Sequence, residues 1–520
     1  MKKLLCLLLS VPMLLSALIS CGGKENKKTE EEAKPAAIVS WVSHSYDKLR
    51  TEMKAPQNAK TEYTVSMAKG ENEGVHVALR SSEDTGLVSF KLLSGENEHI
   101  TFETFHVQKI IKTKGKSWTD PAVPIGGGSR FKLKKNETMA ILIDFKTTAD
   151  TPAGDYGYEF CLCDTKGNVM SRVKITVHVW NFAMPIEKKF QTSMGLSAST
   201  RQPYYDILLE HNLSARWLPA NILDGSADEY MSNPKVTSFC IQTYTNTEES
   251  TVAVYEYLKK NPIWMEKAFF YPLDEPRTAT MVKELEEKCK RLSELCPGIK
   301  IISPYYTNVQ MDPETDQIAY MSSFMTSHCP KLSNWDDKEI YSAEQMVKYD
   351  SFADRMKALK ERGDTIWAYV CNYPLAPYLN IKVDDEGIGS RVLFWQMYQR
   401  DIDGFLYWNS TYYDKLPDKD PWKSVDTFGD GIFGDGILFY PGKHVGQSDP
   451  VVSIRMKIIR DGIDDIELLY LAEELFTREW VDERVNKVSK SLTSVDVTSD
   501  EFAAIRIEIA EAIEAKLNEK

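Results

Sequence analysis

The stretch FFYPLDEPR, residues 269–277, ends an apolar run with two adjacent carboxylates, Asp274 and Glu275. On a continuing β-strand neighbouring side chains point to opposite faces, so one of the two acids would enter a core. Pro276 lacks the N–H that a strand needs and indicates that the strand ends here. Once the chain has left the strand, both carboxylates can turn into one cavity. The stretch therefore predicts a strand that leads into a pair of functional acids.

Short apolar strands alternate with helical stretches on both sides of this motif. Between the strand at 267–273 and the next one, Val282 to Cys296 carry an apolar face at helical spacing, which Pro297 and Gly298 end. Eight strand–helix alternations favour a (β/α)8 barrel of the TIM type over residues 186–480. Two further helices, at 451–476 and 500–517, are predicted to pack on the outside. The eight predicted strands are 190–196, 215–218, 238–244, 267–273, 300–306, 321–327, 365–371 and 404–408.

The region before the barrel has a period of two. Val75, Val77 and Leu79 alternate with other residues, as do the valines and isoleucine from Val173 to Val179. Such alternation is typical of strands with one buried face, and it predicts an antiparallel β-sandwich. The predicted fold is therefore multidomain. It consists of an N-terminal antiparallel β-sandwich at 36–185, a (β/α)8 TIM-type barrel at 186–480 and a C-terminal helical segment at 481–520.

The N-terminus has the pattern of a targeting segment. Lys2 and Lys3 precede an apolar run at 4–19, which is too short for a membrane-spanning helix. The run ends in Leu-Ile-Ser-Cys21, which resembles the lipobox of bacterial lipoproteins; an ordinary secretory signal is the alternative. We expect a signal peptide at 1–20, lipidation of Cys21 and a polar tether at 21–35. The predicted location is the bacterial cell envelope, with the protein lipid-anchored to the outer membrane on its periplasmic or surface face.

Composition narrows the possible partners. The formal net charge of -13 disfavours nucleic acid. Aromatic residues make up 11% of the 520 residues and include eleven tryptophans, which suits either sugar stacking or a large core. Neither the cysteines nor the histidines have the spacing of metal ligands, so we expect no metal and no cofactor. The sequence carries no signal for an oligomeric state.

The position of the acid pair suggests its chemistry. Barrel enzymes build their sites at the carboxyl ends of the strands, where Asp274 and Glu275 are predicted to lie. Two close carboxylates repel each other, which raises the proton affinity of at least one and suits it to general acid catalysis. The alternative is a helix N-terminus, where acids favour the helix dipole.

Adjacency of the two acids also bears on the mechanism. In ordinary retaining glycosidases the acid and the nucleophile lie on opposite sides of the anomeric carbon, about 5 Å apart. Consecutive residues do not easily straddle a sugar in this way. They suit a division in which one carboxyl protonates the leaving oxygen and the other orients a 2-acetamido group, whose own carbonyl oxygen attacks the anomeric carbon.

Four blocks of sequence resemble the catalytic domain of glycoside hydrolase family 123, and they occur in the order of that family. They are Tyr271-Pro-Leu-Asp-Glu-Pro276, Gly404-Phe-Leu-Tyr-Trp-Asn409, Gly434-Asp-Gly-Ile-Leu-Phe-Tyr-Pro-Gly442 and the helix from Ser453 to Asp465. The resemblance implies a β-N-acetylgalactosaminidase that acts with substrate assistance. It also implies that Asp274 orients the acetamido group and that Glu275 is the general acid and then the general base.

Further residues are predicted to bind the sugar. Trp408 and Tyr440 match aromatic positions of the family, and Tyr271 and Asn409 lie in its blocks. Others are predicted at the mouth of the barrel because they lie along or beyond the ends of the strands; core packing is the alternative for each. The candidate substrate-binding residues are Tyr271, Tyr305, Tyr306, His328, Trp367, Tyr369, Asn372, Trp408, Asn409 and Tyr440.

The sequence therefore predicts a membrane-anchored hydrolase that releases terminal β-linked N-acetylgalactosamine, or a related 2-acetamido sugar, from glycans. Two alternatives stay open. One is a conventional retaining glycosidase with Glu275 as the acid and a nucleophile from another strand. The other is a surface lipoprotein that binds glycans without cleaving them. The presence of both acids disfavours the second alternative, because binding alone seldom needs such a pair.

Overall fold

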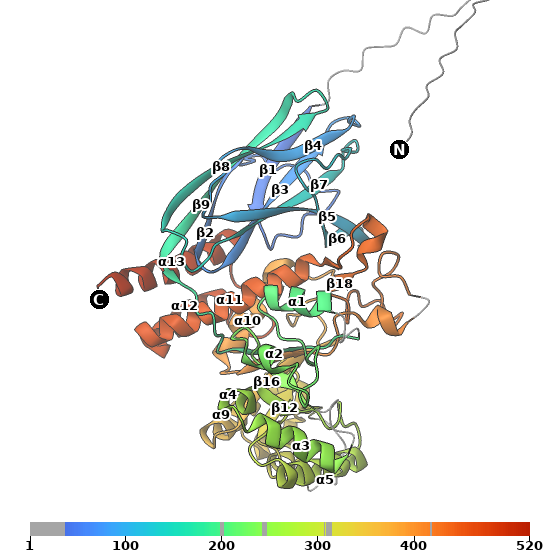
Figure 1. The fold of residues 1–520 in the computed structure, drawn as a ribbon, viewed down its shortest axis with the longest axis vertical. Coiled ribbons are helices and arrows are strands. Elements are labelled where there is room, and N and C mark those ends of the chain that lie inside the picture. The colour runs from blue at the N-terminus through green and yellow to red at the C-terminus, as the bar shows by residue number, and fades with distance from the viewer. Residues whose placement is uncertain are drawn as a thin grey trace, which may run out of the picture. The chain divides into compact units, whose positions relative to one another are not determined.

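The computed structural model describes residues 37–197, 202–241, 247–305, 307, 315–416 and 419–519. The predicted signal peptide, Cys21, the tether and Tyr306 lie outside these residues. Figure 1 shows the described chain, with β-sheets in its N-terminal third and mixed helices and strands after them. None of the helices in the described ranges combines the length and the hydropathy that crossing a membrane requires.

The residues with a period of two form two β-sheets. One sheet is antiparallel throughout; the other pairs β8 with β9 and β4 antiparallel, but β2 runs parallel to β9. This parallel pair departs from the predicted antiparallel order. In spatial order, the first sheet consists of β1 (Ile38–His44), β3 (Asn72–Ser81), β7 (Thr138–Lys146), β5 (Thr101–Thr113) and β6 (Lys116–Pro124). The second consists of β2 (Glu62–Lys69), β9 (Val169–Ala183), β8 (Gly154–Asp164) and β4 (Val88–Ser94).

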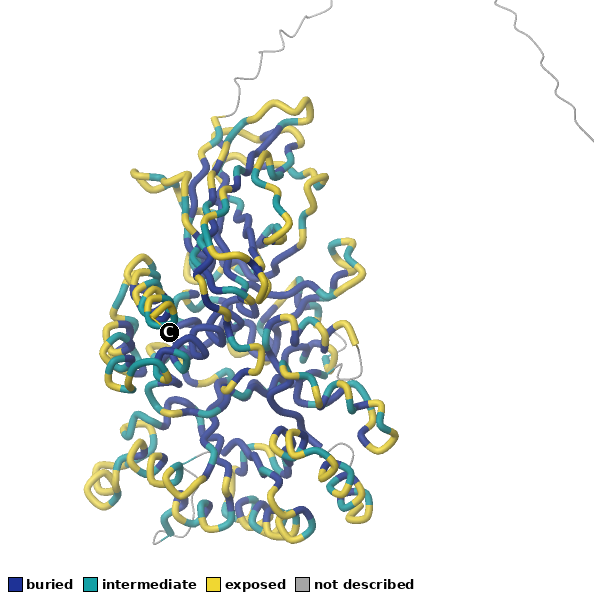
Figure 2. Tube along the Cα trace, turned by 60° about the vertical axis from the view of Figure 1, so that its left-hand side comes forward, coloured by how far each residue is buried: buried dark blue, intermediate teal, exposed yellow. Residues whose placement is uncertain are grey.

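The two sheets enclose a hydrophobic core. Val75, Val77 and Leu79 of β3 meet the apolar residues of β9 there, as their alternation predicts. Ala78, on the opposite face of β3, belongs to a second core that continues into the C-terminal part of the chain. Figure 2 accordingly shows long buried stretches running from the sheets into the rest of the molecule. β3 is therefore covered on both faces.

The strands after residue 190 are parallel and short. They form one sheet of five strands and another of three, and each predicted strand contributes at least a bridge. The five-stranded sheet consists of β10 (Gln191–Met194), β17 (Gly404–Tyr407), β16 (Thr365–Val370), β15 (Ser327–Pro330) and β14 (Pro304–Tyr305). The three-stranded sheet consists of β11 (Phe239–Cys240), β12 (Ala268–Phe270) and β13 (Lys300–Ile301). A separate antiparallel pair joins β18 (Phe439–Tyr440) to β19 (Val451–Val452).

The described strands do not close into one sheet of eight. The segment predicted at 215–218 is reduced to a single bridge between Met194 and Ala215. The strand predicted at 321–327 is wrong in its position, because Met321 lies in a helix and the strand begins at Ser327. Met321 and Met325 are four residues apart and both enter the core, a spacing that suits a helix as well as a strand.

Helices connect these strands. The predicted amphipathic helix is α5, which begins after the N-cap Thr278 and buries Val282, Leu285 and Cys289. The helices up to the last parallel strand are α1 (Gln202–Glu210), α2 (Asp228–Ser232), α3 (Glu248–Leu258), α4 (Pro262–Lys267), α5 (Ala279–Leu295), α6 (Gln317–Ser322), α7 (Asp337–Ile340), α8 (Ala343–Lys348), α9 (Phe352–Glu361) and α10 (Gly387–Gln399). Three more follow: α11 (Ile454–Leu475), α12 (Arg478–Val488) and α13 (Ser499–Asn518).

Helix α11 is buried, which corrects the prediction that it packs on the outside. It touches β6 of the first sheet as well as α10, α12 and α13. Most of its charged residues are buried too, and strands of the sheets supply partners for some of them: Lys457 and Arg460 bind Asp144 of β7 at 2.7 and 2.8 Å. Because both faces of α11 meet protein, its sequence lacks the polar stripe of a surface helix.

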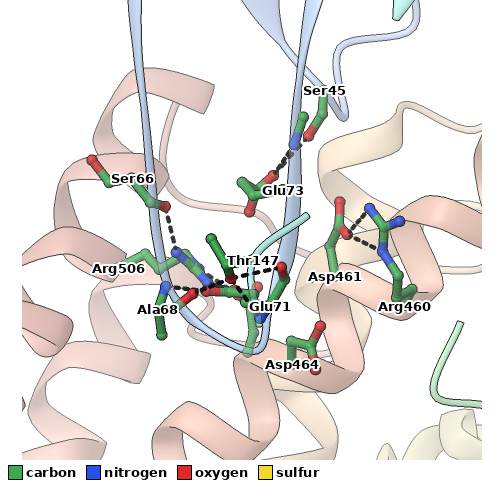
Figure 3. Close-up of polar contacts among 12 residues, drawn as sticks. Ser45, Ser66, Ala68, Glu71, Glu73, Thr147, Arg460, Asp461, Asp464 and Arg506 are labelled. Atoms are coloured by element: carbon green, nitrogen blue, oxygen red, sulfur yellow. Dashed lines mark hydrogen bonds and ion pairs between the residues drawn. The ribbon is translucent and has the colours of Figure 1, made fainter. Parts of the chain in front are cut away.

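A network of buried charges joins the sheets to the C-terminal helices (Figure 3). Arg391 of α10 binds Glu73 at 2.8 Å and Asp465 at 2.7 Å, and Arg506 of α13 binds Asp465 and Glu71. Residues 37–520 form one compact unit. The limits predicted at 185 and 480 stay predictions, and α12 runs through the second of them.

Candidate active site

The acid pair lies just beyond β12, where the strand has ended. Pro272 offers no N–H, and the backbone N–H of Glu275 donates to the carbonyl of Pro304 at 3.1 Å. Glu275 has a φ of 42°, a left-handed conformation that non-glycine residues seldom adopt. The alternation of a strand is thereby broken between Asp274 and Glu275. Since Thr278 caps α5 with its own side chain, the acids are not the helix cap that the alternative interpretation required.

Both carboxylates are held by tyrosines from strand ends. The hydroxyl of Tyr271 donates to Oδ1 of Asp274 at 2.7 Å. The hydroxyl of Tyr369, near the end of β16, donates to Oε1 of Glu275 at 2.7 Å. Arg277 binds the other oxygen of Glu275 at 3.0 Å, and its own side chain is 68% exposed. The side chain of Glu275 itself is 15% exposed.

A buried cation packs against Tyr271, the residue that holds Asp274. The guanidinium carbon of Arg216 is 4.5 Å from the ring centre of Tyr271 and 5.4 Å from that of Trp217. Burial raises the pKa of the Tyr271 hydroxyl well above its usual value, although the charge of Arg216 lowers it. Tyr271 therefore stays protonated and keeps donating its hydrogen bond to Asp274.

Asp274 and Glu275 open into the same cavity, which has a volume of about 620 Å³. The carboxyl ends of β12, β16 and β17 meet here, together with the loop that precedes β18. The residues that line it are Tyr271, Asp274, Glu275, Arg277, Pro304, Tyr369, Cys371, Asn372, Tyr373, Leu406, Trp408, Tyr412, Phe428, Asp430 and Asp435. This size suits a ligand of one or two sugar rings.

One wall of the cavity is aromatic. Trp408, the residue after β17, stacks on Phe428 with ring centres 5.9 Å apart, and Tyr412 meets Trp408 edge-on at 4.7 Å. Phe428 is 51% exposed. An exposed ring beside carboxylates offers the flat apolar face on which a sugar ring stacks.

Asp435 is a third carboxylate at this wall. Its Oδ1 accepts hydrogen bonds from the indole N–H of Trp408 at 2.8 Å and from the hydroxyl of Tyr407 at 3.3 Å. Burial raises the pKa of Asp435 to about 6, although these two donors lower it. Asp435 therefore titrates close to neutral pH and orients Trp408.

Six of the predicted site residues lie together in the cavity. They come from three strand ends, where side chains that leave neighbouring parallel strands converge. They are Tyr271, Asp274, Glu275, Tyr369, Asn372 and Trp408. Tyr306 lies outside the described residues.

Five other predicted residues do not line this cavity. Tyr305 and His328 are buried; His328 binds Asp364 at 2.9 Å, ahead of β16 and thus at the opposite end of the strands. Trp367 is buried two residues before Tyr369 on the same face of β16, one layer below the cavity. Each of these residues fills the interior, as the core-packing alternative required.

Asn409 and Tyr440 have structural partners instead of a place in the cavity. The Asn409 amide donates to the Ser197 hydroxyl at 2.8 Å. The hydroxyl of Tyr440 donates to Asp120 of β6, far along the chain from the parallel strands. The prediction that Tyr440 forms a wall of the sugar site therefore does not hold for this cavity.

Several lining residues were not predicted. Tyr412 begins a short 3-10 helix, and Phe428 and Asp430 lie in a loop; neither segment has a periodicity that indicates its position. The position of Asp435 could have been inferred from the sequence, since it lies between Gly434 and Gly436 in one of the four blocks. Tandem glycines around a single acid are typical of a loop whose backbone approaches another group closely.

Comparisons with known proteins agree with this geometry. Residues 229–472 match the family model described as glycoside hydrolase 123, catalytic domain. This stretch is a catalytic domain of glycoside hydrolase family 123. The matched stretch contains all six predicted residues that line the cavity, and it supports a glycoside hydrolase.

One solved structure extends the likeness beyond the family 123 domain. A family 123 glycoside hydrolase from Clostridium perfringens, solved in a study of glycolipid glycan hydrolysis, is 13% identical with a TM-score of 0.63. The match covers 93% of this chain and 98% of that one, so the two proteins share a fold. The N-terminal domain of PorA matches 27% of this chain at 11% identity with a TM-score of 0.18, covering 97% of its own length. A comparison with the curated proteins found no match.

Proposed function

We propose that this family 123 glycoside hydrolase releases terminal β-linked N-acetylgalactosamine, or a related 2-acetamido sugar, with assistance from the substrate. One observation carries the proposal: Asp274 and Glu275 are consecutive, yet both line one cavity beside an aromatic wall. Such a pair lies on one side of the anomeric carbon. The group that attacks from the other side is then supplied by the substrate itself.

The proposed reaction has two steps. Glu275 gives its proton to the glycosidic oxygen as the bond from that oxygen to the anomeric carbon breaks. The acetamido carbonyl oxygen forms a bond to the same carbon, and Asp274 accepts a hydrogen bond from the acetamido N–H. Water then attacks the anomeric carbon as the bond from that carbon to the acetamido oxygen breaks, and it gives a proton to Glu275, so the released sugar keeps its configuration. Tyr369 and Tyr271 hold the two carboxylates in position.

The likeness to the enzyme studied for glycolipid glycan hydrolysis supports a glycan as the substrate. We also infer that the two parallel sheets belong to one barrel. Met194 bridges Ala215, the N–H of Cys240 donates to the carbonyl of Arg216 at 2.7 Å, and a single segment from Lys300 to Tyr305 carries both β13 and β14. These links support a cyclic order of eight strands.

Replacing Glu275 tests the reaction. With an aryl β-N-acetylgalactosaminide, we expect Glu275→Gln to lower kcat by about 10²-fold or more, because a positioned general acid contributes about 10² to 10⁴. Asp274→Asn should also lower kcat on the acetamido substrate. Unchanged turnover by Glu275→Gln would remove the assignment.

A conventional retaining mechanism is the second candidate, and Asp435 is the observation that favours it. Asp435 is a further carboxylate in the same cavity and comes from a different part of the chain. Aryl glycosides without the N-acetyl group separate the two mechanisms: they should be inert under substrate assistance and hydrolysed under the conventional one. Tight glycan binding without any released sugar would instead support the alternative that the protein binds glycans without cleaving them.

We further propose that the chain is anchored to a membrane of the cell envelope through lipid on Cys21. The motif Leu-Ile-Ser-Cys21 and the polar segment after it support this proposal. Cells fed an alkyne-tagged fatty acid should label the wild-type protein and the control Cys6→Ala, but not Cys21→Ala. Label on the last variant would contradict the anchor.

A further inference from the structure

The loop from Gly434 to Ile437 fixes the aromatic wall of the cavity. Asp435 accepts the hydrogen bond of the Trp408 indole, and the Tyr407 hydroxyl accepts one from the N–H of Gly436 at 2.9 Å. Gly436 lies so close to the indole that a Cβ there would be 2.5 Å from a ring carbon. A shift of this loop would therefore move Trp408.

Arg455, at the start of α11, fixes the loop in turn. Its Nη1 donates to the carbonyl of Gly434 at 2.9 Å and to that of Ile381 at 3.0 Å. Its Nη2 donates to the carbonyl of Ile437. The side chain is fully buried. One guanidinium thus holds both ends of the loop that carries Asp435.

The counter-ion of Arg455 comes from the N-terminal sheets. Asp120 of β6 binds Nε and Nη2 of Arg455 in a two-pronged contact, each at 2.8 Å. Its carboxylate is as deeply buried as the guanidinium, and the Tyr440 hydroxyl donates to it as well. A backbone bridge between Pro121 and Ser453 lies beside this contact. Removing the charge of Asp120 would leave a buried cation without its partner.

We propose that Asp120 is a positioning residue for the substrate cavity, acting through Arg455, the loop from Gly434 to Ile437, and Asp435 on Trp408. The N-terminal sheets then belong to the active site, because they set the position of its aromatic wall. The inference rests on the proposed function only for what the cavity binds. The chain of contacts itself does not depend on the substrate.

Two matched pairs of variants test this proposal in the full chain. Asp120→Asn weakens the support of the loop, whereas Asp144→Asn weakens the Lys457 and Arg460 contacts, which join the same sheet to the same helix but do not reach the loop. Arg455→Lys and Arg460→Lys form a milder second pair, should the first fail to fold. Both members of a pair should lower Tm, since each disturbs a buried ion pair.

Amide hydrogen exchange gives the decisive readout. We expect Asp120→Asn and Arg455→Lys to speed exchange in residues 404–412 and 433–440, and the two control variants to leave these segments protected. With an aryl β-N-acetylgalactosaminide, KM should rise by about tenfold in the first two variants, while any fall in kcat is smaller. In the controls KM should stay near that of the wild type.

Two outcomes would overturn the proposal: unchanged exchange in both segments after either substitution at Asp120 or Arg455, or an equal change in the matched control. These results do not depend on catalysis. If the wild-type protein does not cleave the glycoside, the proposed function fails while the exchange data still decide the role of Asp120.

Discussion

At the scale of single residues, Gly429 and Gly436 have nearly the same positive φ angle but different surroundings. Their φ angles are 76° and 73°. A Cβ at Gly429 would meet nothing within 4 Å, whereas one at Gly436 would collide with the Trp408 ring. The two positions therefore separate backbone strain from the close approach of the loop to the indole.

We expect Gly429→Ala to lower the free energy of unfolding by about 1 kcal/mol, the cost of a side chain at positive φ. Gly436→Ala should cost about 1 to 3 kcal/mol more, because the added methyl group displaces Trp408. Urea denaturation of both variants measures the difference. Equal losses would mean that the indole moves aside freely.

Asp435 gives the wild-type protein a dependence on pH. Burial raises its pKa from 3.8 to about 6, so the folded chain holds a proton that the unfolded chain has lost at pH 5. Folding is therefore favoured on the acid side, and this stabilisation is lost as pH rises through 6. From pH 5 to pH 8 the loss is about 1.4 kcal/mol.

The variant Asp435→Asn should lack this loss of stability with rising pH. We expect its free energy of unfolding, measured in urea at pH 5 and pH 8, to fall less than that of the wild type by about that amount. If the difference in unfolding free energy between pH 5 and pH 8 is the same in wild type and Asp435→Asn, another group is responsible for the titration.

The residues of the site were predictable where they extend from strand ends. Asp274, Glu275 and Tyr369 follow from the ends of two strands. Trp367 was not separable from Tyr369 by sequence, because both point to the same face of β16 and only their depth differs. Phe428 comes from a loop whose path is set by tertiary contacts, and no local pattern encodes such a path.

At the scale of elements, α5 illustrates a helix that its own sequence specifies. Its apolar stripe and the Pro297-Gly298 stop predicted it, and the Thr278 side chain completes its first turn by accepting from the N–H of Met281 at 3.2 Å. Helix α11 illustrates the opposite case. Its buried charges are paired with strands and helices far away in the sequence, and a pattern of one segment cannot reveal those partners.

The cap of α5 can be tested with a neighbouring threonine as the control. Thr278→Ala should lower the free energy of unfolding by about 1 kcal/mol, because an N–H at the helix start loses its acceptor. Thr280→Ala lies inside the same helix on an exposed position and should be neutral or slightly stabilising, since alanine favours helices. Equal losses in chemical denaturation would contradict the role of Thr278 as cap.

At the scale of the whole molecule, buried charges make stability depend on pH. Burial raises the pKa of Asp461 to about 8, with Arg460 opposing the shift and Glu73 adding to it. The group is therefore protonated in the folded chain at neutral pH but ionised in the unfolded one. Its contribution to stability is lost as pH rises through 8.

Asp461→Asn should reduce the loss of stability that accompanies rising pH. Between pH 6 and pH 9 we expect the wild type to lose on the order of 2 kcal/mol more than the variant. Asp144→Asn is the control: Lys457 and Arg460 hold the pKa of Asp144 below its usual range despite its burial, so its ionised form persists throughout this interval. The control should be less stable at every pH but keep most of the slope, because Asp144 contributes least among the charges that shift the pKa of Asp461. Parallel curves for wild type and Asp461→Asn would contradict the assignment.

The burial of α11 has a consequence for how such a protein can be assembled from parts. Arg455, Lys457 and Arg460 each find their carboxylate on a strand of the N-terminal sheets. A protein made of residues 190–520 alone would lack these carboxylates. Its three cations, which are buried and paired in the full chain, would lie unpaired on an exposed surface. Recombination that joined the β-sandwich of another protein to this catalytic half would leave the same three cations without their carboxylates. We expect the two halves to be inherited together.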